Sequence, residues 1–279
     1  MAQRIPYVGV TVAKFQNYMP SFLIKGLKLL GMDFIEINQS ILPEIDRFAN
    51  SLGSLITAFH LPLVSENGWD FSCLDYKVEI DDMIATLRHY KKKLRIQHVI
   101  SHPPEPEKSA NQVDSSFEFL FENLQKLGLP VYLENVTSLD PKAFLNIYWR
   151  SKRALGTLLA GMCFDAPHYF VDGHDPIAQY LTFRDLVGCV HLSDCLVGKD
   201  AHLPFNSGGA LPINEFLATL RNNNFGGYIT LELKPQSLND LEAYIDSYMK
   251  TLQFLNYKKH LTTKLRILAL RPLINRFAA

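Results

Sequence analysis

The chain has 279 residues, and 47% of them are hydrophobic, which is enough to bury one sizeable core. Its 28 Lys and Arg residues balance its 28 Asp and Glu residues, so the overall charge provides no field that attracts nucleic acid or an acidic membrane. The N-terminus lacks the charged and apolar regions of a signal peptide, and no apolar run reaches the about 20 residues of a membrane span. The four cysteines form no C-x-x-C pair. These features predict a cytoplasmic protein whose cysteines are small core residues.

Short apolar runs alternate along the chain with longer amphipathic stretches. The runs are typical of strands buried on both faces and occupy residues 7–11, 34–38, 55–60, 97–102, 131–135, 162–165, 189–193 and 228–233. Helical patterns cover residues 21–30, 76–94, 115–127 and 241–257. Alternation of this kind predicts the α/β class and a single (β/α)8 TIM barrel over residues 1–257. A doubly wound open sheet is the alternative, and the absence of a glycine-rich phosphate motif after the first strand disfavours it.

Residues 258–279 form a basic segment after the barrel. Its leucine and isoleucine side chains predict an amphipathic helix with an apolar stripe, interrupted near Pro272; the stripe consists of Leu261, Leu265, Leu268 and Ile274. We expect this appendage to pack on or beside the barrel. A helix that binds a membrane surface or a partner is the alternative.

Seven of the eight predicted strands place a His, Asp or Glu residue within or just after the apolar run. In a TIM barrel the C-terminal ends of the strands converge on one mouth, where active sites form. A single histidine at such a position is more often a hydrogen-bonded structural residue. Burying this many ionisable groups without partners is costly, however, and metal coordination removes the cost. Imidazole and carboxylate are ligands for zinc, and also for manganese or iron, so the pattern predicts a divalent metal site.

At these residues the chain resembles the xylose isomerase-like TIM-barrel superfamily. The metal pattern is most similar to endonuclease IV, the zinc-dependent apurinic/apyrimidinic endonuclease, over residues 7–235. The resemblance implies three metal ions. The first would be held by His60, His102 and Glu134; the second by Glu134, as a bridge, with Asp165, His191 and Glu232; the third by His168, Asp200 and His202.

The resemblance transfers the metal site and not the DNA substrate. The first strand and its loop, VGVTVAKFQNY, lack the Gly-Gly of the nucleases, and Leu63 follows the His60 motif where residues that probe the DNA minor groove are expected. The segment after Asp200 and His202 contains Asn206-Ser207-Gly208-Gly209 in place of the usual glycine-bearing segment.

The sugar isomerases and epimerases of the same superfamily imply a smaller site. One metal would be held by Glu134, Asp165, His191 and Glu232, and the two glutamates would exchange a proton with the substrate. Glu36, at the end of the second strand, would then bind substrate; the alternative is a salt-bridged structural residue. Lys234 would contact a phosphate or carboxylate, or would face solvent.

Two enzyme hypotheses follow, with Glu134 and Glu232 as catalytic residues in both. The first is a metal-dependent phosphoester hydrolase of the endonuclease IV type, with up to three zinc ions and a small phosphoester or abasic DNA as substrate. The second is a single-metal sugar isomerase or epimerase. A barrel without activity is a third possibility, which the complete set of ligand residues disfavours.

Overall fold

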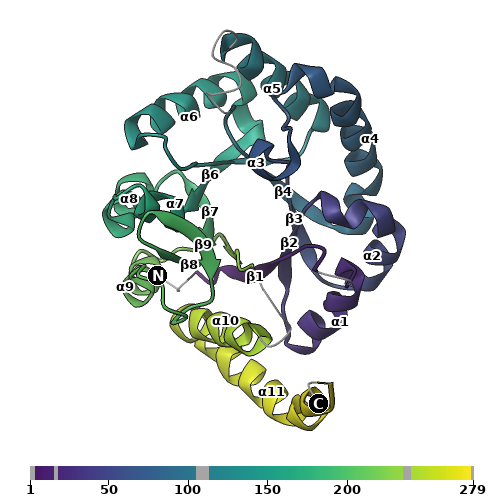
Figure 1. Ribbon diagram of the computed structural model, residues 1–279, viewed down its shortest axis with the longest axis vertical. Coiled ribbons are helices and arrows are strands. Elements are labelled where there is room, and N and C mark those ends of the chain that lie inside the picture. Colours follow the sequence, from purple (N-terminus) through teal and green to yellow (C-terminus); the bar gives the residue numbers. More distant parts are fainter. Residues whose placement is uncertain (1–3, 16–17, 105–112, 235–239, 278–279) are drawn as a thin grey trace.

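The computed structural model describes residues 4–15, 18–104, 113–234 and 240–277. Parallel strands close into a barrel in the order β1-β10-β7-β6-β5-β4-β3-β2, surrounded by helices (Figure 1). The strands are β1 Tyr7–Val12, β2 Phe34–Ile37, β3 Ile56–His60, β4 Ile96–Ser101, β5 Val131–Glu134, β6 Leu159–Asp165, β7 Val187–Leu192 and β10 Tyr228–Leu231. Because β1 pairs with both β2 and β10, the sheet has no free edge. The predicted TIM barrel is confirmed, and the open sheet is excluded.

The helices lie outside the barrel and connect successive strands. They are α1 Pro20–Leu29, α2 Ile45–Leu52, α3 Val64–Asn67, α4 Lys77–Leu94, α5 Val113–Leu127, α6 Pro141–Leu155, α7 Ala166–Val171, α8 Pro176–Phe183, α9 Ile213–Asn222 and α10 Leu241–Leu255. Two of them show how local sequence sets a helix start. Asp140 and Asp175 each accept two backbone N–H bonds as N-caps, and a proline, whose missing N–H costs nothing in the first turn, follows each aspartate.

Two hydrophobic regions support the barrel. The larger one fills the space between the strands and the surrounding helices. A small one lies inside the barrel and consists of Ile100, Cys163 and Cys189, with Tyr132 and Tyr228 packed against them. The predicted polar residues lie beyond this inner layer, where the strands end.

A β-hairpin extends from the mouth of the barrel after β7. It consists of β8 Asp194–Leu196 and β9 Lys199–Leu203, which pair antiparallel, and Figure 1 shows it beside the end of β7. Gly198 has a φ of 71° in the turn between the two strands, a conformation that glycine adopts without a steric penalty. The hairpin carries Asp200 and His202, which the sequence analysis did not assign to a strand.

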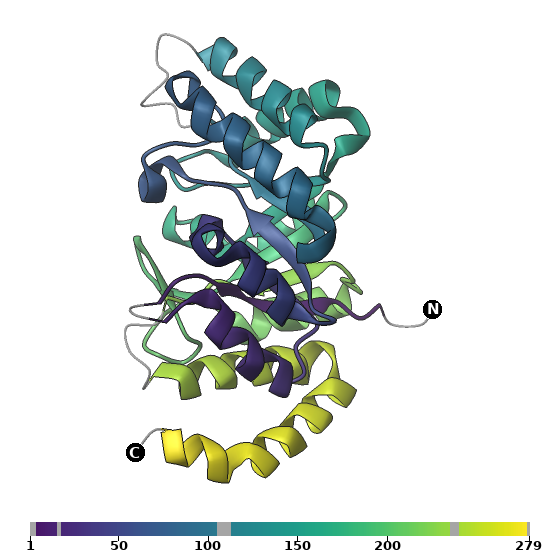
Figure 2. The ribbon, with the colours of Figure 1, turned by 90° about the vertical axis from the view of Figure 1, so that its right-hand side faces the viewer.

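The basic C-terminal segment forms α11, Tyr257–Phe277, which packs against α10 (Figure 2). One curved helix continues through Pro272, and the expected break of the apolar stripe there falls outside the described side chains. The leucine stripe itself is not the face that is buried. Leu261, Leu265 and Leu268 are 45–67% exposed, whereas Thr263 is buried and the His260 ring bonds the Met249 carbonyl at 3.0 Å. Ile274 lies outside the described side chains.

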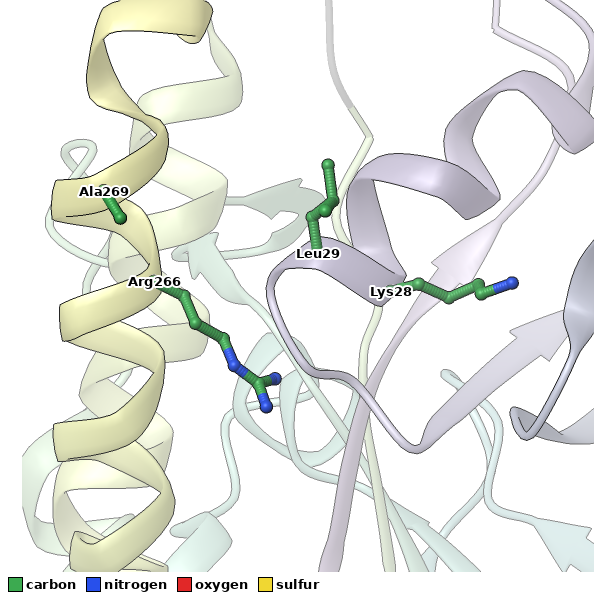
Figure 3. Close-up of a pocket in the computed structure, with 4 residues that line it drawn as sticks. All are labelled: Lys28, Leu29, Arg266 and Ala269. Atoms are coloured by element: carbon green, nitrogen blue, oxygen red, sulfur yellow. The ribbon is translucent and has the colours of Figure 1, made fainter.

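Arg266 reaches from α11 to the end of α1, beside a pocket of about 390 Å³ that Lys28, Leu29 and Ala269 also line (Figure 3). Gly31 follows α1 with a φ of 78°, and a Cβ atom there would lie 1.9 Å from Nη1 of Arg266. The left-handed backbone conformation therefore favours glycine here, whereas the guanidinium, at the end of a flexible side chain, could move aside. Among the described helices, none is both long enough and apolar enough to span a membrane.

Candidate metal centre

The carboxyl ends of the strands bring two of the three predicted ligand groups together. His60, His102 and Glu134 present ligand atoms that all lie within 4.8 Å of one another. The same holds for a second group that shares Glu134 and adds the residues predicted for the second metal; these are Asp165, His191 and Glu232. Residues up to 172 positions apart in sequence therefore meet because a closed parallel barrel places all strand ends at one mouth.

Glu134 joins the two groups, because each of its carboxylate oxygens faces a different set of imidazoles. Oε2 lies 3.2 Å from His60 Nε2 and 3.0 Å from His102 Nε2. Oε1 lies 3.2 Å from His191 Nδ1. Glu134 ends β5, and its side chain is 1% exposed. Glu134 therefore lies between the two predicted ligand groups, with one oxygen facing each of them.

Two of the predicted histidine ligands have one ring nitrogen held by a backbone carbonyl. His60 Nδ1 lies 2.9 Å from the Leu61 carbonyl and His168 Nδ1 lies 2.7 Å from the Asn135 carbonyl. Since a carbonyl oxygen only accepts, these nitrogens carry a proton, and Nε2 of each ring is the nitrogen that can bind a metal once it loses its own proton. Histidine ligands of metals are typically held in this way by an acceptor behind the ring.

The third predicted group surrounds Asp200 in the β8–β9 hairpin. Oδ2 of Asp200 lies 3.1 Å from His202 Nε2 and 3.5 Å from His168 Nε2. His202 has a φ of 45°, and its Nδ1 lies 3.2 Å from the Glu232 carbonyl. Among the described residues these three do not bring all their ligand atoms within 4.8 Å of one another, so this group is more open than the other two.

The carboxylates of the centre have strongly perturbed acidities. Burial raises the pKa of Glu134, but His191 and His102 outweigh it and hold the pKa well below its usual range. Burial raises the pKa of Asp165 to about 7; the charge of His168 opposes this shift, and the charges of Glu134 and Asp200 add to it. At neutral pH the Glu134 carboxylate is therefore ionised, whereas Asp165 is about half protonated.

The histidines are shifted in the opposite sense. Burial lowers the pKa of His60, but its hydrogen bond to Glu134 and the surrounding carboxylates raise the pKa to about 9. The pKa of His168 rises to about 10, since Asp165 and Asp200 outweigh its burial. Without metal, these rings carry protons at neutral pH that balance the buried carboxylates. A bound metal cation would replace these protons as the positive charge that balances the carboxylates.

The residues present fit a divalent metal. His102 Nε2, His191 Nδ1 and Asp200 Oδ1 are buried and have no hydrogen-bond partner of good geometry, although two of them lie near a Glu134 oxygen. A metal ion bound between these side chains would supply the missing partner. Nitrogen and oxygen donors without cysteine at the mouth are the set expected for a catalytic zinc, manganese or iron site.

Glu36 lies inside the barrel and has no exposed surface. Its Oε2 lies 3.0 Å from His191 Nε2 and accepts a hydrogen bond from Thr230 at 3.0 Å. Its predicted contact with substrate stays a prediction, and the contacts that the structure shows are those of a residue that holds His191.

Two polar residues at the centre were not predicted from the sequence. The side chain of Asn135 forms two bonds with the Asp165 backbone, at 2.8 and 2.9 Å, and so fixes the end of β6 to the end of β5. Thr230 supports Glu36, as described above. Both are neutral, and a sequence search for ionisable ligands gives no signal for them, although Asn135 directly follows Glu134.

Lys234 lies at the rim of the mouth. Its Nζ donates to Glu66 Oε1 at 2.7 Å, and its side chain is 55% exposed. Its backbone N–H donates to the His202 carbonyl at 3.1 Å, which places it beside the third ligand group. The predicted contact with a substrate anion stays a prediction.

Solved structures with the same fold carry several activities in their names. A D-tagatose 3-epimerase-like protein has a TM-score of 0.65 and 18% identity, covering 90% of this chain and 99% of the other. A xylose isomerase domain protein from Planctomyces limnophilus has a TM-score of 0.66 and 14% identity, covering 91% and 99%. An AP endonuclease, family 2, from Brucella melitensis has a TM-score of 0.61 and 12% identity, covering 84% and 95%. At these identities the likeness concerns the fold alone.

The family of this chain is assigned from its sequence. No protein with a curated description matches the chain. A family model matches residues 25–256, which run from α1 to the end of α10 and include all nine predicted metal ligands. The model describes the xylose isomerase-like TIM barrel. This chain belongs to the xylose isomerase-like TIM barrel family.

Proposed function

We propose that this protein is a metal-dependent phosphoester hydrolase with two or three divalent ions, zinc first among them, at the mouth of its barrel. The observation that carries the proposal is the position of Glu134, whose two oxygens face separate imidazole groups. A single-metal enzyme needs only the group around His191, and the pair His60 and His102 would then have no metal to hold. Clustered divalent ions lower the pKa of a bound water to about 7 and stabilise a leaving oxygen.

The proposed roles of the side chains differ with their depth in the barrel. Glu134 fixes the spacing of the two groups, and Glu36 acts as a positioning residue that orients His191 instead of touching substrate. Glu232 is 16% exposed on its side chain, so it faces the space where substrate enters and is placed to accept or return a proton.

The third group, around Asp200, lies closest to solvent of the three. The side chain of Asp200 is 19% exposed, and its hairpin overhangs the mouth. This group and Lys234 are placed to bind the phosphate and the leaving group of the substrate. A small phosphorylated compound, such as a sugar phosphate, is the substrate class that we favour, because duplex DNA requires many cationic contacts and the chain carries no net charge. Abasic DNA is the second substrate class.

A sugar isomerase or epimerase is the alternative function, and one observation favours it. Glu134 Oε1 and Glu232 Oε1 lie 3.2 and 3.5 Å from the same nitrogen of His191. Two carboxylates beside one metal position are suited to remove a proton from a sugar carbon and return it. Under this alternative His60, His102 and His202 bind substrate or are structural.

Parallel assays separate the two functions. Protein loaded with zinc or manganese is incubated with phosphate mono- and diesters, with sugar phosphates and with a duplex containing one abasic site. We expect release of phosphate or strand incision, lost on chelation and in Glu134→Gln, and retained in Glu66→Gln as the rim control. The same protein is incubated with ketohexoses in deuterated water. Deuterium incorporation into the sugar without cleavage of any phosphoester would overturn the hydrolase and support the epimerase.

A further inference from the structure

A pair of thiols lies inside the barrel, directly below the metal centre. Cys163 of β6 and Cys189 of β7 are partners in the parallel register of the two strands. Neighbouring strands lie about 4.8 Å apart, so the two side chains stand next to each other on the inner face. Both residues are free and fully buried. Asp165 and His191 follow Cys163 and Cys189 by two residues on the same strands, so the thiols lie one layer below these two predicted ligands.

Two histidines flank this pair. His191 is two residues after Cys189, so both side chains point into the barrel. One ligand atom each from Cys163, Cys189 and His191 lie within 4.8 Å of one another. His98 lies on the other side, and the Cys189 thiol is within interaction distance of its ring.

His98 is 1% exposed, and among the described residues neither of its ring nitrogens has a hydrogen-bond partner of good geometry, the Cys189 thiol being the polar group beside the ring. The ring is packed by aromatic neighbours, with Tyr228 at 4.4 Å and Tyr132 at 4.8 Å between ring centroids. Burying an imidazole with both nitrogens unbonded is costly. Packing alone does not account for a histidine here, since a phenylalanine would fill the same position without that cost.

The spacing of these donors matches a metal ion. A tetrahedral zinc ion holds sulfur at about 2.3 Å and nitrogen at about 2.0–2.1 Å, which puts the ligand atoms roughly 3.5–4 Å apart. We propose that Cys163, Cys189 and His191 form a second, deeper metal position that takes a thiophilic ion such as Zn²⁺ or Cd²⁺, with His98 next to Cys189 as the fourth donor. The donors above it are carboxylates and imidazoles, which suit harder ions, so the two positions differ in their preferred metal.

The deeper position shares His191 with the centre at the mouth. His191 Nε2 is occupied by Glu36, and its Nδ1 faces Glu134 and Glu232. An ion on the thiols therefore competes for the imidazole that the upper centre uses. These contacts support the proposal of a deeper metal site, and the proposal is independent of the reaction that the centre at the mouth performs.

The test is a metal titration with a spectroscopic signature. Metal-free protein, kept reduced with a phosphine, is titrated with Co²⁺ and separately with Cd²⁺. Thiolate ligation produces a charge-transfer absorption in the near ultraviolet that nitrogen and oxygen ligands do not produce, so ions at the mouth are silent. We expect this absorption to saturate at one ion per chain, and to be lost in Cys163→Ser and in Cys189→Ser. Cys195→Ser removes another buried cysteine outside the cluster and should keep it.

The wild-type spectrum shows whether the thiols bind a metal ion even if a serine variant fails to fold. If wild-type protein binds Co²⁺ but shows no thiolate absorption while its thiols are free by chemical titration, the deeper site does not exist. The same conclusion follows if the absorption persists in both serine variants. His98→Gln should weaken Cd²⁺ binding about tenfold or more. An inactive enzyme with a normal thiolate absorption would overturn the hydrolase and leave this site standing.

Discussion

Oε2 of Glu36 lies 3.0 Å from Nε2 of His191, and neither side chain has any exposed surface. The carboxylate accepts a hydrogen bond from Nε2, so Nδ1, which faces Glu134 and Glu232, is the nitrogen left to bind a metal. A ligand histidine that loses such an acceptor binds metal about 10 to 100 times more weakly. We expect Glu36→Gln to lower metal affinity by this factor, measured by competition with a chelator. Glu66→Gln, a carboxamide exchange at the rim, should leave affinity unchanged. Equal affinities in all three proteins would show that Glu36 has no role in the metal centre.

The metal-free protein should lose stability as pH rises. The pKa of His60 is raised to about 9, that of His168 to about 10 and that of Asp165 to about 7. All three exceed their unfolded values, so the folded state holds extra protons whose stabilisation is complete below the unfolded pKa. That stabilisation is lost as pH rises through the folded values. The lowered pKa of Glu134 acts only on the acid side, because this group is ionised in both states above pH 6.

Chemical denaturation of chelator-treated protein at pH 6, 7.5 and 9 measures this effect. We expect the free energy of unfolding to fall across the series. Saturating zinc should reverse the trend, because metal replaces the protons and binds more tightly as they leave. A metal-free protein that grows more stable towards pH 9 would contradict these shifted acidities.

Two glycine substitutions should have opposite effects on stability. A Cβ at Gly9 in β1 would lie 2.2 Å from the Phe34 carbonyl oxygen of β2, and backbone atoms in a closed barrel have little room to move. Gly9→Ala should therefore destabilise the protein by about 1–3 kcal/mol or more. Gly26 lies in α1 with nothing within 4 Å of the added Cβ, so Gly26→Ala should stabilise by about 0.5–1 kcal/mol. Thermal unfolding of both variants checks the pair, and a stable Gly9→Ala protein would contradict the packing of β1 on β2.

Lys234 should act on substrate binding rather than on folding. Its ion pair with Glu66 is exposed at the rim, and such pairs contribute about 0.2–1 kcal/mol. We expect Lys234→Met to leave the melting temperature nearly unchanged and to raise KM for a phosphorylated substrate. Glu66→Gln releases the lysine and should not raise KM. If Lys234→Met has the KM of the wild type, Lys234 is a solvent-facing residue only.

The sequence was sufficient to predict the barrel because its strands are buried on both faces. Such strands appear as continuous apolar runs, and the eight runs correspond in position to the eight strands. The ligand positions followed from the same rule, since His60, Glu134, Asp165 and their counterparts come where these runs end. Topology alone then requires them to meet.

Other features depend on contacts that no local pattern encodes. The strands of the β8–β9 hairpin are short, and β9 mixes Lys199, Asp200 and His202 with apolar residues, so it has no clear period. Leu261, Leu265 and Leu268 have helical spacing, but spacing does not reveal which face of α11 meets α10. The resemblance to the sugar isomerases implied that Glu36 binds substrate, with a salt-bridged structural residue as the alternative, whereas its depth in the barrel and its contact with His191 are visible only in three dimensions.

The central claim is that Glu134 bridges two metal positions, and the number of tightly bound ions tests it most directly. Protein stripped with a chelator is reloaded with zinc, desalted and counted by elemental analysis, with native mass spectrometry as a second measurement. The bridge predicts at least two ions per chain in the wild type, and at most one in Glu134→Gln. Replacing His60 and His102 together should remove one ion and leave the group around His191 loaded. A wild-type chain that binds a single ion, and keeps it after the loss of His60 and His102, would contradict the bridge and leave a single-metal site.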